Sequence, residues 1–183
     1  MGKKILLMIG AFIAGIGVTL GGFALSKDTN LSTATTYGDW KLACPPRAVA
    51  KAECALTQDI LQNGTGMTFV HMQLVGAGDA RRLLIVVPHG VLIKPGLGFA
   101  AGNTPLKVLQ YETCDSVGCI AYLPLDTATL DTLTDTEAGK IIVVWRDGKE
   151  LAYPCSLRGF TKGLSAFGWA SFARTSWLGR LLP

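Results

Sequence analysis

The chain begins with a long uncharged segment, ILLMIGAFIAGIGVTLGGFAL, which runs from Ile5 to Leu25 and follows Lys3 and Lys4. As a helix, this segment would extend about 31 Å at about 1.5 Å per residue, enough to cross a hydrocarbon core of about 30 Å. The positive-inside rule keeps the two lysines in the cytoplasm and places everything after Lys27 across the membrane. The rest of the chain must therefore fold after export.

This apolar segment has two possible fates. The apolar core of a signal peptide usually contains only about 7 to 15 residues, so the greater length favours a retained transmembrane anchor. Ala24 and Ser26 are small residues at the positions that a signal peptidase reads, so cleavage would leave Lys27 at the N-terminus. We expect a single-pass inner-membrane protein with its C-terminal domain in the periplasm. The alternative is a secreted or periplasmic protein after signal cleavage.

Two glycines in this segment, Gly17 and Gly21, form a G-x-x-x-G step. Such a step allows the backbone of a second helix to approach closely. We therefore name both glycines as candidate contacts within the membrane. The expected partners are membrane lipid around the N-terminal helix and another membrane or periplasmic protein.

Five cysteines follow the apolar segment: Cys44, Cys54, Cys114, Cys119 and Cys155. Export brings them into an oxidising compartment, where disulfides form. The first two and the next two are local pairs, and each pair brackets a polar loop between two strand-like runs. We therefore predict two structural disulfides, one within each local pair.

Metal binding and redox chemistry are the alternatives for these cysteines. A zinc site requires about four ligands, and the other candidates, His71, His89 and Cys155, have no metal-like spacing. A redox pair of the C-x-x-C type has two residues between its cysteines, whereas four residues separate Cys114 from Cys119. We expect neither a metal nor a cofactor.

The exported part is a series of short strand-like runs separated by turn residues. RRLLIVVP contains the apolar run that is typical of a buried strand. KIIVVWRDGKELAYPCSL predicts a hairpin whose tight turn contains Asp147 and Gly148. Helix signals are few: Asp126 can cap a short helix through Leu133, and a second helix is expected from about Gly159. We predict an all-β fold, a β-sandwich with short helices, preceded by one N-terminal transmembrane helix.

Four motifs, together with Cys54, carry a resemblance: YGDWKLAC, PHGVLIKPG, YETCDSVGCIAYLPLD and SLRGFTKGLSAF. In this order the chain resembles the invasion-associated locus B family from about Tyr37 to Phe167. The resemblance implies a β-sandwich domain of Gram-negative cell envelopes, with the cysteine pairs as disulfides and no known catalytic centre. The family name also implies a role in host-cell invasion.

The predicted organisation has four parts: an anchor or signal at 1–26, a polar linker at 27–36, the family-like β-sandwich at 37–167 and an apolar, aromatic tail at 168–183. Two features depart from the family pattern. Cys155 stands where the family usually has a small apolar residue, so this cysteine is a buried free thiol or a link to another molecule. The tail interleaves tryptophans with arginines.

This tail composition suits a membrane interface or a groove on a partner, whereas the simpler interpretation is a terminal helix partly docked on the sandwich. The tail residues that we name as candidate partner or membrane contacts are Trp169, Phe172, Trp177 and Leu181. We expect truncation after Phe167, which removes the whole tail, to weaken association and to leave folding almost unchanged.

Catalysis and nucleic-acid binding find little support in the sequence. Ser165 in GLSAF lacks the second glycine of a G-x-S-x-G elbow, and GLGFAAG has the wrong spacing for a dinucleotide loop. The net charge is only +4, and the lysines and arginines are scattered. We expect a non-catalytic protein that acts by protein–protein interaction, as an accessory or stabilising subunit of an inner-membrane complex. The alternative is an exported virulence factor involved in host-cell invasion.

Overall fold

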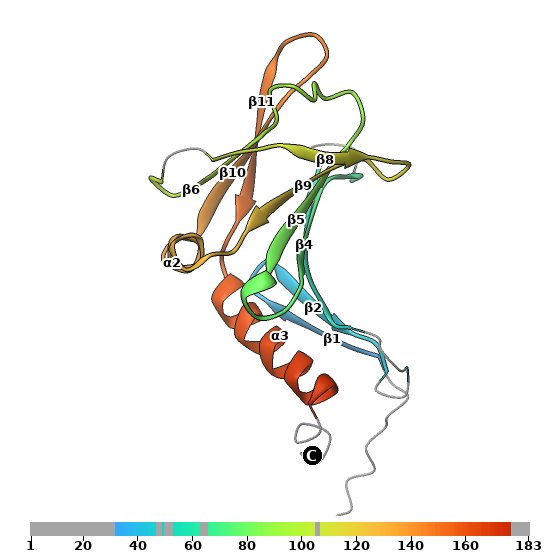
Figure 1. The fold of residues 1–183 in the computed structure, drawn as a ribbon, viewed down its shortest axis with the longest axis vertical. Helices are drawn as coiled ribbons and strands as arrows, with labels where there is room; N and C mark the ends of the chain where they lie inside the picture. The colour runs from blue at the N-terminus through green and yellow to red at the C-terminus, as the bar shows by residue number, and fades with distance from the viewer. Residues whose placement is uncertain (1–31, 47–48, 50–52, 63–65, 105–106, 177–183) are drawn as a thin grey trace, which may run out of the picture. The chain divides into compact units, whose positions relative to one another are not determined.

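The computed structural model describes residues 32–46, 49, 53–62, 66–104 and 107–176. These residues form two antiparallel sheets and two α-helices (Figure 1). The seven-stranded sheet has the order β1-β2-β3-β4-β5-β9-β8, and the four-stranded sheet has the order β11-β10-β6-β7. The predicted β-sandwich-like architecture with short helices is therefore present.

The elements of the seven-stranded sheet are β1 (Thr33–Tyr37), β2 (Trp40–Cys44), β3 (Ala55–Leu61), β4 (Thr68–Val75), β5 (Arg82–Val87), β8 (Tyr111–Cys114) and β9 (Cys119–Pro124). The four-stranded sheet contains β6 (Leu97–Ala101), β7 (Lys107–Leu109), β10 (Ala138–Val144) and β11 (Glu150–Ser156). The helices are the 3-10 turn η1 (Gly78–Ala80), α2 (Thr127–Thr134) and α3 (Phe160–Thr175).

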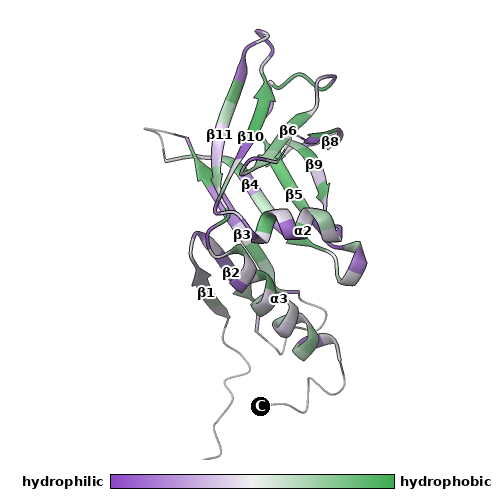
Figure 2. Ribbon diagram, turned by 90° about the vertical axis from the view of Figure 1, so that its left-hand side faces the viewer, coloured by the Kyte–Doolittle hydropathy of each residue, from purple (hydrophilic) through white to green (hydrophobic). Residues whose placement is uncertain are grey.

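One hydrophobic core joins both sheets and α3. Alternate residues of β5, namely Leu83, Ile85 and Val87, are buried, as are Ile141 and Val143 of β10. Both strands are strongly hydrophobic in Figure 2. Every second residue is buried because successive side chains of a strand point to opposite faces of the sheet.

The apolar run RRLLIVVP is buried on only one face. Leu84 and Val86 alternate with the buried residues of β5 and are partly exposed. Their neighbours in the sheet are Gln73 and His71 of β4, and Tyr122 and Ile120 of β9. Apolar and polar side chains from adjacent strands thus share the outer face of the seven-stranded sheet.

The predicted linker at 27–36 ends too late. Thr33 to Thr36 belong to β1, which pairs along its whole length with β2. YGDWKLAC is consequently not one strand, because Gly38 and Asp39 form the turn between β1 and β2. β1 is exposed on both faces except at Tyr37, so its sequence shows no alternation of apolar and polar residues. Its threonines favour an extended backbone, and its hydrogen bonds to β2 make it a strand.

The predicted helices and hairpin are present. The side chain of Asp126 accepts a hydrogen bond from the backbone N–H of Thr129 and caps α2. α3 begins directly after Gly159. In the β10–β11 hairpin, Gly148 has a φ of 80°, and its N–H donates to the carbonyl of Trp145. The Trp145 N–H also donates to the carbonyl of Lys149, so the turn itself consists of residues 146–148. A three-residue turn is typical of a type I turn with a bulge rather than the predicted tight turn.

A membrane-spanning helix is not found among the described residues. The predicted anchor at residues 1–26, including Gly17 and Gly21, lies outside this part of the chain. The anchor therefore stays a prediction.

Candidate interaction surface on helix α3

Helix α3 lies along β1 and β2 (Figure 1). At its first residue, Phe160 is completely buried and its ring lies 5.0 Å from that of Trp40. One turn later, Gly163 packs so closely on β3 that a Cβ atom there would lie 2.9 Å from Cδ1 of Leu56. The N-terminal half of α3 is therefore part of the core.

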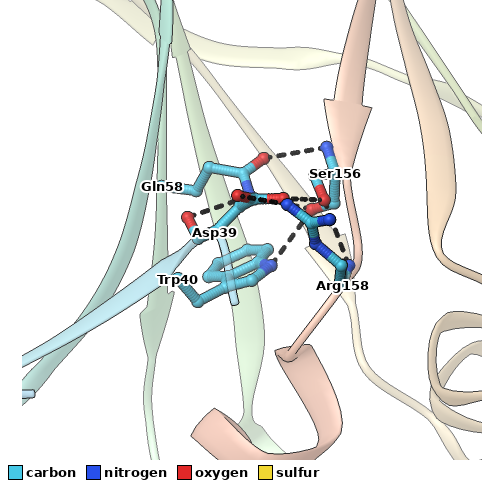
Figure 3. A network of polar contacts seen from close by, with 5 residues as sticks. All are labelled: Asp39, Trp40, Gln58, Ser156 and Arg158. Atoms are coloured by element: carbon cyan, nitrogen blue, oxygen red, sulfur yellow. Dashed lines mark hydrogen bonds and ion pairs between the residues drawn. The ribbon is translucent and has the colours of Figure 1, made fainter. Parts of the chain in front are cut away.

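A polar network fixes the start of this helix (Figure 3). The buried side chain of Gln58 donates to the carbonyl of Ser156 over 2.8 Å and accepts from the Ser156 N–H over 3.1 Å. The indole N–H of Trp40 donates to the same carbonyl over 3.1 Å. These bonds join residues about a hundred positions apart in the chain, so they tie β2 and β3 to the end of β11.

Asp39 extends the polar network toward the solvent. Its carboxylate accepts from the Ser156 hydroxyl over 2.6 Å and from the Arg158 guanidinium over 3.1 Å. The Ser156 hydroxyl and then Arg158 hold the pKa of the Asp39 carboxyl below its usual range, because both stabilise the carboxylate form. The same ion pair raises the pKa of Arg158. The network therefore has a structural role: it holds the turn before α3, and it includes the ion pair of Asp39 and Arg158.

Two glycines allow the backbones to meet at this point. Gly38 and Gly159 have φ values of 57° and 86°, which favour glycine. A Cβ atom at Gly38 would collide with the carbonyl of Arg158, and one at Gly159 would collide with the carbonyl of Tyr37. The backbones of the motifs YGDWKLAC and SLRGFTKGLSAF are thus in close contact at these two glycines. Sequence reasoning missed this contact because a single sequence gives no signal that the two motifs meet.

The C-terminal half of α3 presents two aromatic rings to solvent. Trp169 is 60% exposed and Phe172 is 41% exposed, and their ring centroids lie 5.8 Å apart. Three positions separate them, so they lie on the same face of the helix. We call Trp169 and Phe172 the aromatic pair. Both residues were predicted contacts, whereas Trp177 and Leu181 lie outside the described residues.

The predicted boundary between sandwich and tail does not coincide with a structural break. α3 continues through residues 167 and 168, Ala173 is buried, and the Arg174 guanidinium donates to the carbonyl of Pro45. The backbone of the helix is thus docked almost to its end. Truncation after residue 167 would remove these contacts, and the expectation that it leaves folding almost unchanged stays a prediction.

Both predicted disulfides are present, Cys44–Cys54 and Cys114–Cys119. Cys155 is a buried free thiol, and burial raises its pKa to about 12. It lies against Gly139 on the neighbouring strand, where a Cβ atom would approach its sulfur to 2.7 Å. The thiol fills the space that this glycine leaves, as a small apolar side chain would.

The two histidines make local contacts. His71 Nδ1 lies 2.7 Å from a carboxylate oxygen of Asp59 on the adjacent strand, and His89 Nε2 lies 2.6 Å from the carbonyl of Asp115. Within the described ranges, no group of three or more His, Cys, Asp or Glu side chains is arranged to hold a metal ion. A polar cleft of about 430 Å³ includes Asp131 and Asp135 of α2 and the turn after it. Its remaining lining consists of Ala101, Gly102, Asn103, Thr104, Thr132 and Thr136.

Comparison with known proteins identifies the chain. A crystal structure of invasion associated protein B from Bartonella henselae matches with a TM-score of 0.64 at 20% sequence identity, over 74% of this chain and 96% of that one. This likeness shows the fold. No curated protein matches the sequence. The family model described as Invasion associated locus B (IalB) protein matches residues 40–168, more than half of the chain, and the chain therefore belongs to the IalB family.

Proposed function

We propose that this protein is a non-catalytic envelope protein, anchored in the inner membrane with its β-sandwich in the periplasm. It acts by binding, as an accessory or stabilising subunit of an inner-membrane complex. The two disulfides support export to an oxidising compartment, and the family supports an invasion-associated envelope protein. The anchor and the subunit role go beyond these observations and are the content of the proposal.

The aromatic pair carries the proposal. A docked terminal helix needs apolar residues only on the face that packs against its sheets. α3 fills that face with Phe160, Gly163 and Phe167 and still places two large rings on its opposite face. Adjacent exposed aromatic residues are typical of a contact surface, because they supply a large apolar area with few rotatable bonds.

The proposed contacts have two parts. Gly17 and Gly21 would meet a partner helix in the membrane, since the glycine step permits close backbone approach. On the periplasmic side, the aromatic pair, together with Trp177 and Leu181, would contact either a partner protein or the membrane surface. The family name supports a second function, an exported factor that acts on host cells, which requires the chain to leave the inner membrane.

The test is affinity purification of the full chain from envelopes in a mild detergent, followed by mass spectrometry. We expect one inner-membrane protein at a constant ratio to the chain. The matched variant replaces Gly17 and Gly21 with leucine, which keeps the segment apolar but blocks close helix approach, and it should lose most of that partner. Recovery of the chain without a partner, or from the culture medium instead of the envelope, would contradict the proposal.

A further inference from the structure

We propose that the aromatic pair rests on the anionic lipid surface of the same membrane that holds the anchor. This inference rests on the proposed function for the anchor, and it assigns the aromatic pair to lipid rather than to a protein groove. Trp169 and Phe172 would enter the headgroup region, and Lys162, which is exposed on the same side of α3, would face the lipid phosphates. The domain would then be held to the bilayer at two points.

The start of β1 and the end of α3 lie close together. In the β1–β2 hairpin, Thr33 pairs with Cys44 and Tyr37 pairs with Trp40, so the start of β1 lies at the Cys44 end of β2. The Arg174 guanidinium of α3 bonds to the carbonyl of Pro45, directly after Cys44. The last turn of α3 and the start of β1 therefore lie at the same end of the domain.

The connection between the apolar segment and β1 is short. Eight residue steps lead from Leu25, the last residue of the apolar segment, to Thr33. Fully extended, they span at most about 29 Å. A chain anchored through this segment would therefore keep the start of β1 within about that distance of the bilayer, and the last turn of α3 is at the same end of the domain.

The composition of α3 suits an anionic surface. α3 contains Lys162 and Arg174 and no acidic residue. Lys162 and Ser165 precede Trp169 and Phe172 along the exposed face at helical spacing, so the aromatic residues are closer to the anchored end. The sequence after α3, WLGRLLP, repeats this composition. Aromatic residues with basic neighbours are typical of helices that lie at an anionic membrane surface.

The probe is bromine quenching of tryptophan emission in the full chain, reconstituted in vesicles of phosphatidylcholine with or without phosphatidylglycerol. The lipids carry bromine near the start of the acyl chain. Subtracting the signal of the Trp169→Phe variant isolates Trp169 from the other tryptophans. We expect brominated lipid to remove most of the Trp169 emission, with stronger quenching when phosphatidylglycerol is present and weaker quenching at high salt.

A matched control places a tryptophan on the other end of the domain. Val117 is 74% exposed in the loop between β8 and β9, which lies away from α3 in Figure 1. Val117→Trp in the Trp169→Phe background should keep its emission in the same brominated vesicles. Equal quenching at both positions would mean that the domain has no preferred face toward the bilayer, and the inference would fail.

Two further outcomes separate this inference from the proposed function. An unquenched Trp169 in every lipid mixture, with the chain still bound to the vesicles, would overturn the lipid contact alone. The second comparison is partner recovery in detergent, where no bilayer exists, for the wild-type chain and the Trp169→Ser/Phe172→Ser double variant. Equal recovery is expected. A loss in the double variant would identify the surface as a protein contact, so this inference would fail while the proposed function would stand.

Discussion

The two ends of α3 differ although one continuous helix contains both. At the first end, Phe160 is completely buried and the polar network of Asp39, Gln58, Ser156 and Arg158 holds the preceding turn. At the other end, Trp169 and Phe172 face solvent above a backbone that is still docked. The first half of the helix therefore stabilises the fold, whereas the second half, although docked, also presents an exposed apolar surface.

The same substitution at the two ends should give the largest contrast. Phe160→Ala removes a fully buried ring and its contact with Trp40, so it should lower the free energy of unfolding by about 3–5 kcal/mol. Phe172→Ala removes a ring that is 41% exposed and does not belong to the core, so the loss of stability should be much smaller, about 1 kcal/mol or less. Denaturant titration of both variants tests the contrast, and similar losses at the two positions would remove the distinction.

The disulfides are expected to rank next. Replacing Cys44 and Cys54 with alanine should cost roughly 2–3 kcal/mol, slightly more than replacing Cys114 and Cys119, because the first pair closes a longer loop. Unfolding midpoints of the two double variants measure this. Non-reducing peptide mapping supplies the control, and a bridge that includes Cys155 would contradict the pairing.

The polar network should contribute less than the buried ring. Gln58→Leu leaves the N–H and carbonyl of Ser156 without their amide partner, which should destabilise the protein by about 1–3 kcal/mol. Gln73→Leu on the neighbouring strand β4 is the matched control, because that side chain is partly exposed on the outer face of the sheet. If both variants unfold at the same denaturant concentration, the network does not fasten the helix.

The smallest expected effect is a change in how the stability of the protein depends on pH in the acidic range. The folded-state pKa of Asp39 is below its value in the unfolded chain, so its contribution to stability is complete above the unfolded value near 3.8. That contribution is lost as the pH falls through the lower folded-state pKa. Asp39→Asn should therefore flatten the acid limb of an unfolding curve measured from pH 7 to pH 2. An unchanged acid limb would show that other carboxylates determine it.

Local signals predicted much of this fold. Asp126 as the cap of α2, the strands of the β10–β11 hairpin and the two short cysteine pairs are each specified by residues close together in the sequence. The start of α3 was predicted for the same reason. These features depend on capping, turn chemistry and loop closure, all of which operate over a few residues.

Long-range contacts were not predictable in the same way. The bonds from Gln58 to Ser156 and the close approach of Gly38 and Gly159 depend on how the two sheets come together. β1 has no apolar alternation, so its polar residues resembled a linker until the pairing with β2 was known. The aromatic pair was recognised from composition, but the structure was needed to show that its rings remain exposed.

Retention of the N-terminal segment is the central claim, because both the accessory role and the lipid contact require an anchored chain. The direct measurement is N-terminal sequencing and intact mass of the protein purified from cell envelopes. We predict that the mature chain retains Met1 to Leu25 and has a mass close to the 19.4 kDa of the full sequence. A chain that begins at Lys27 would contradict the account and would favour the exported, invasion-related function.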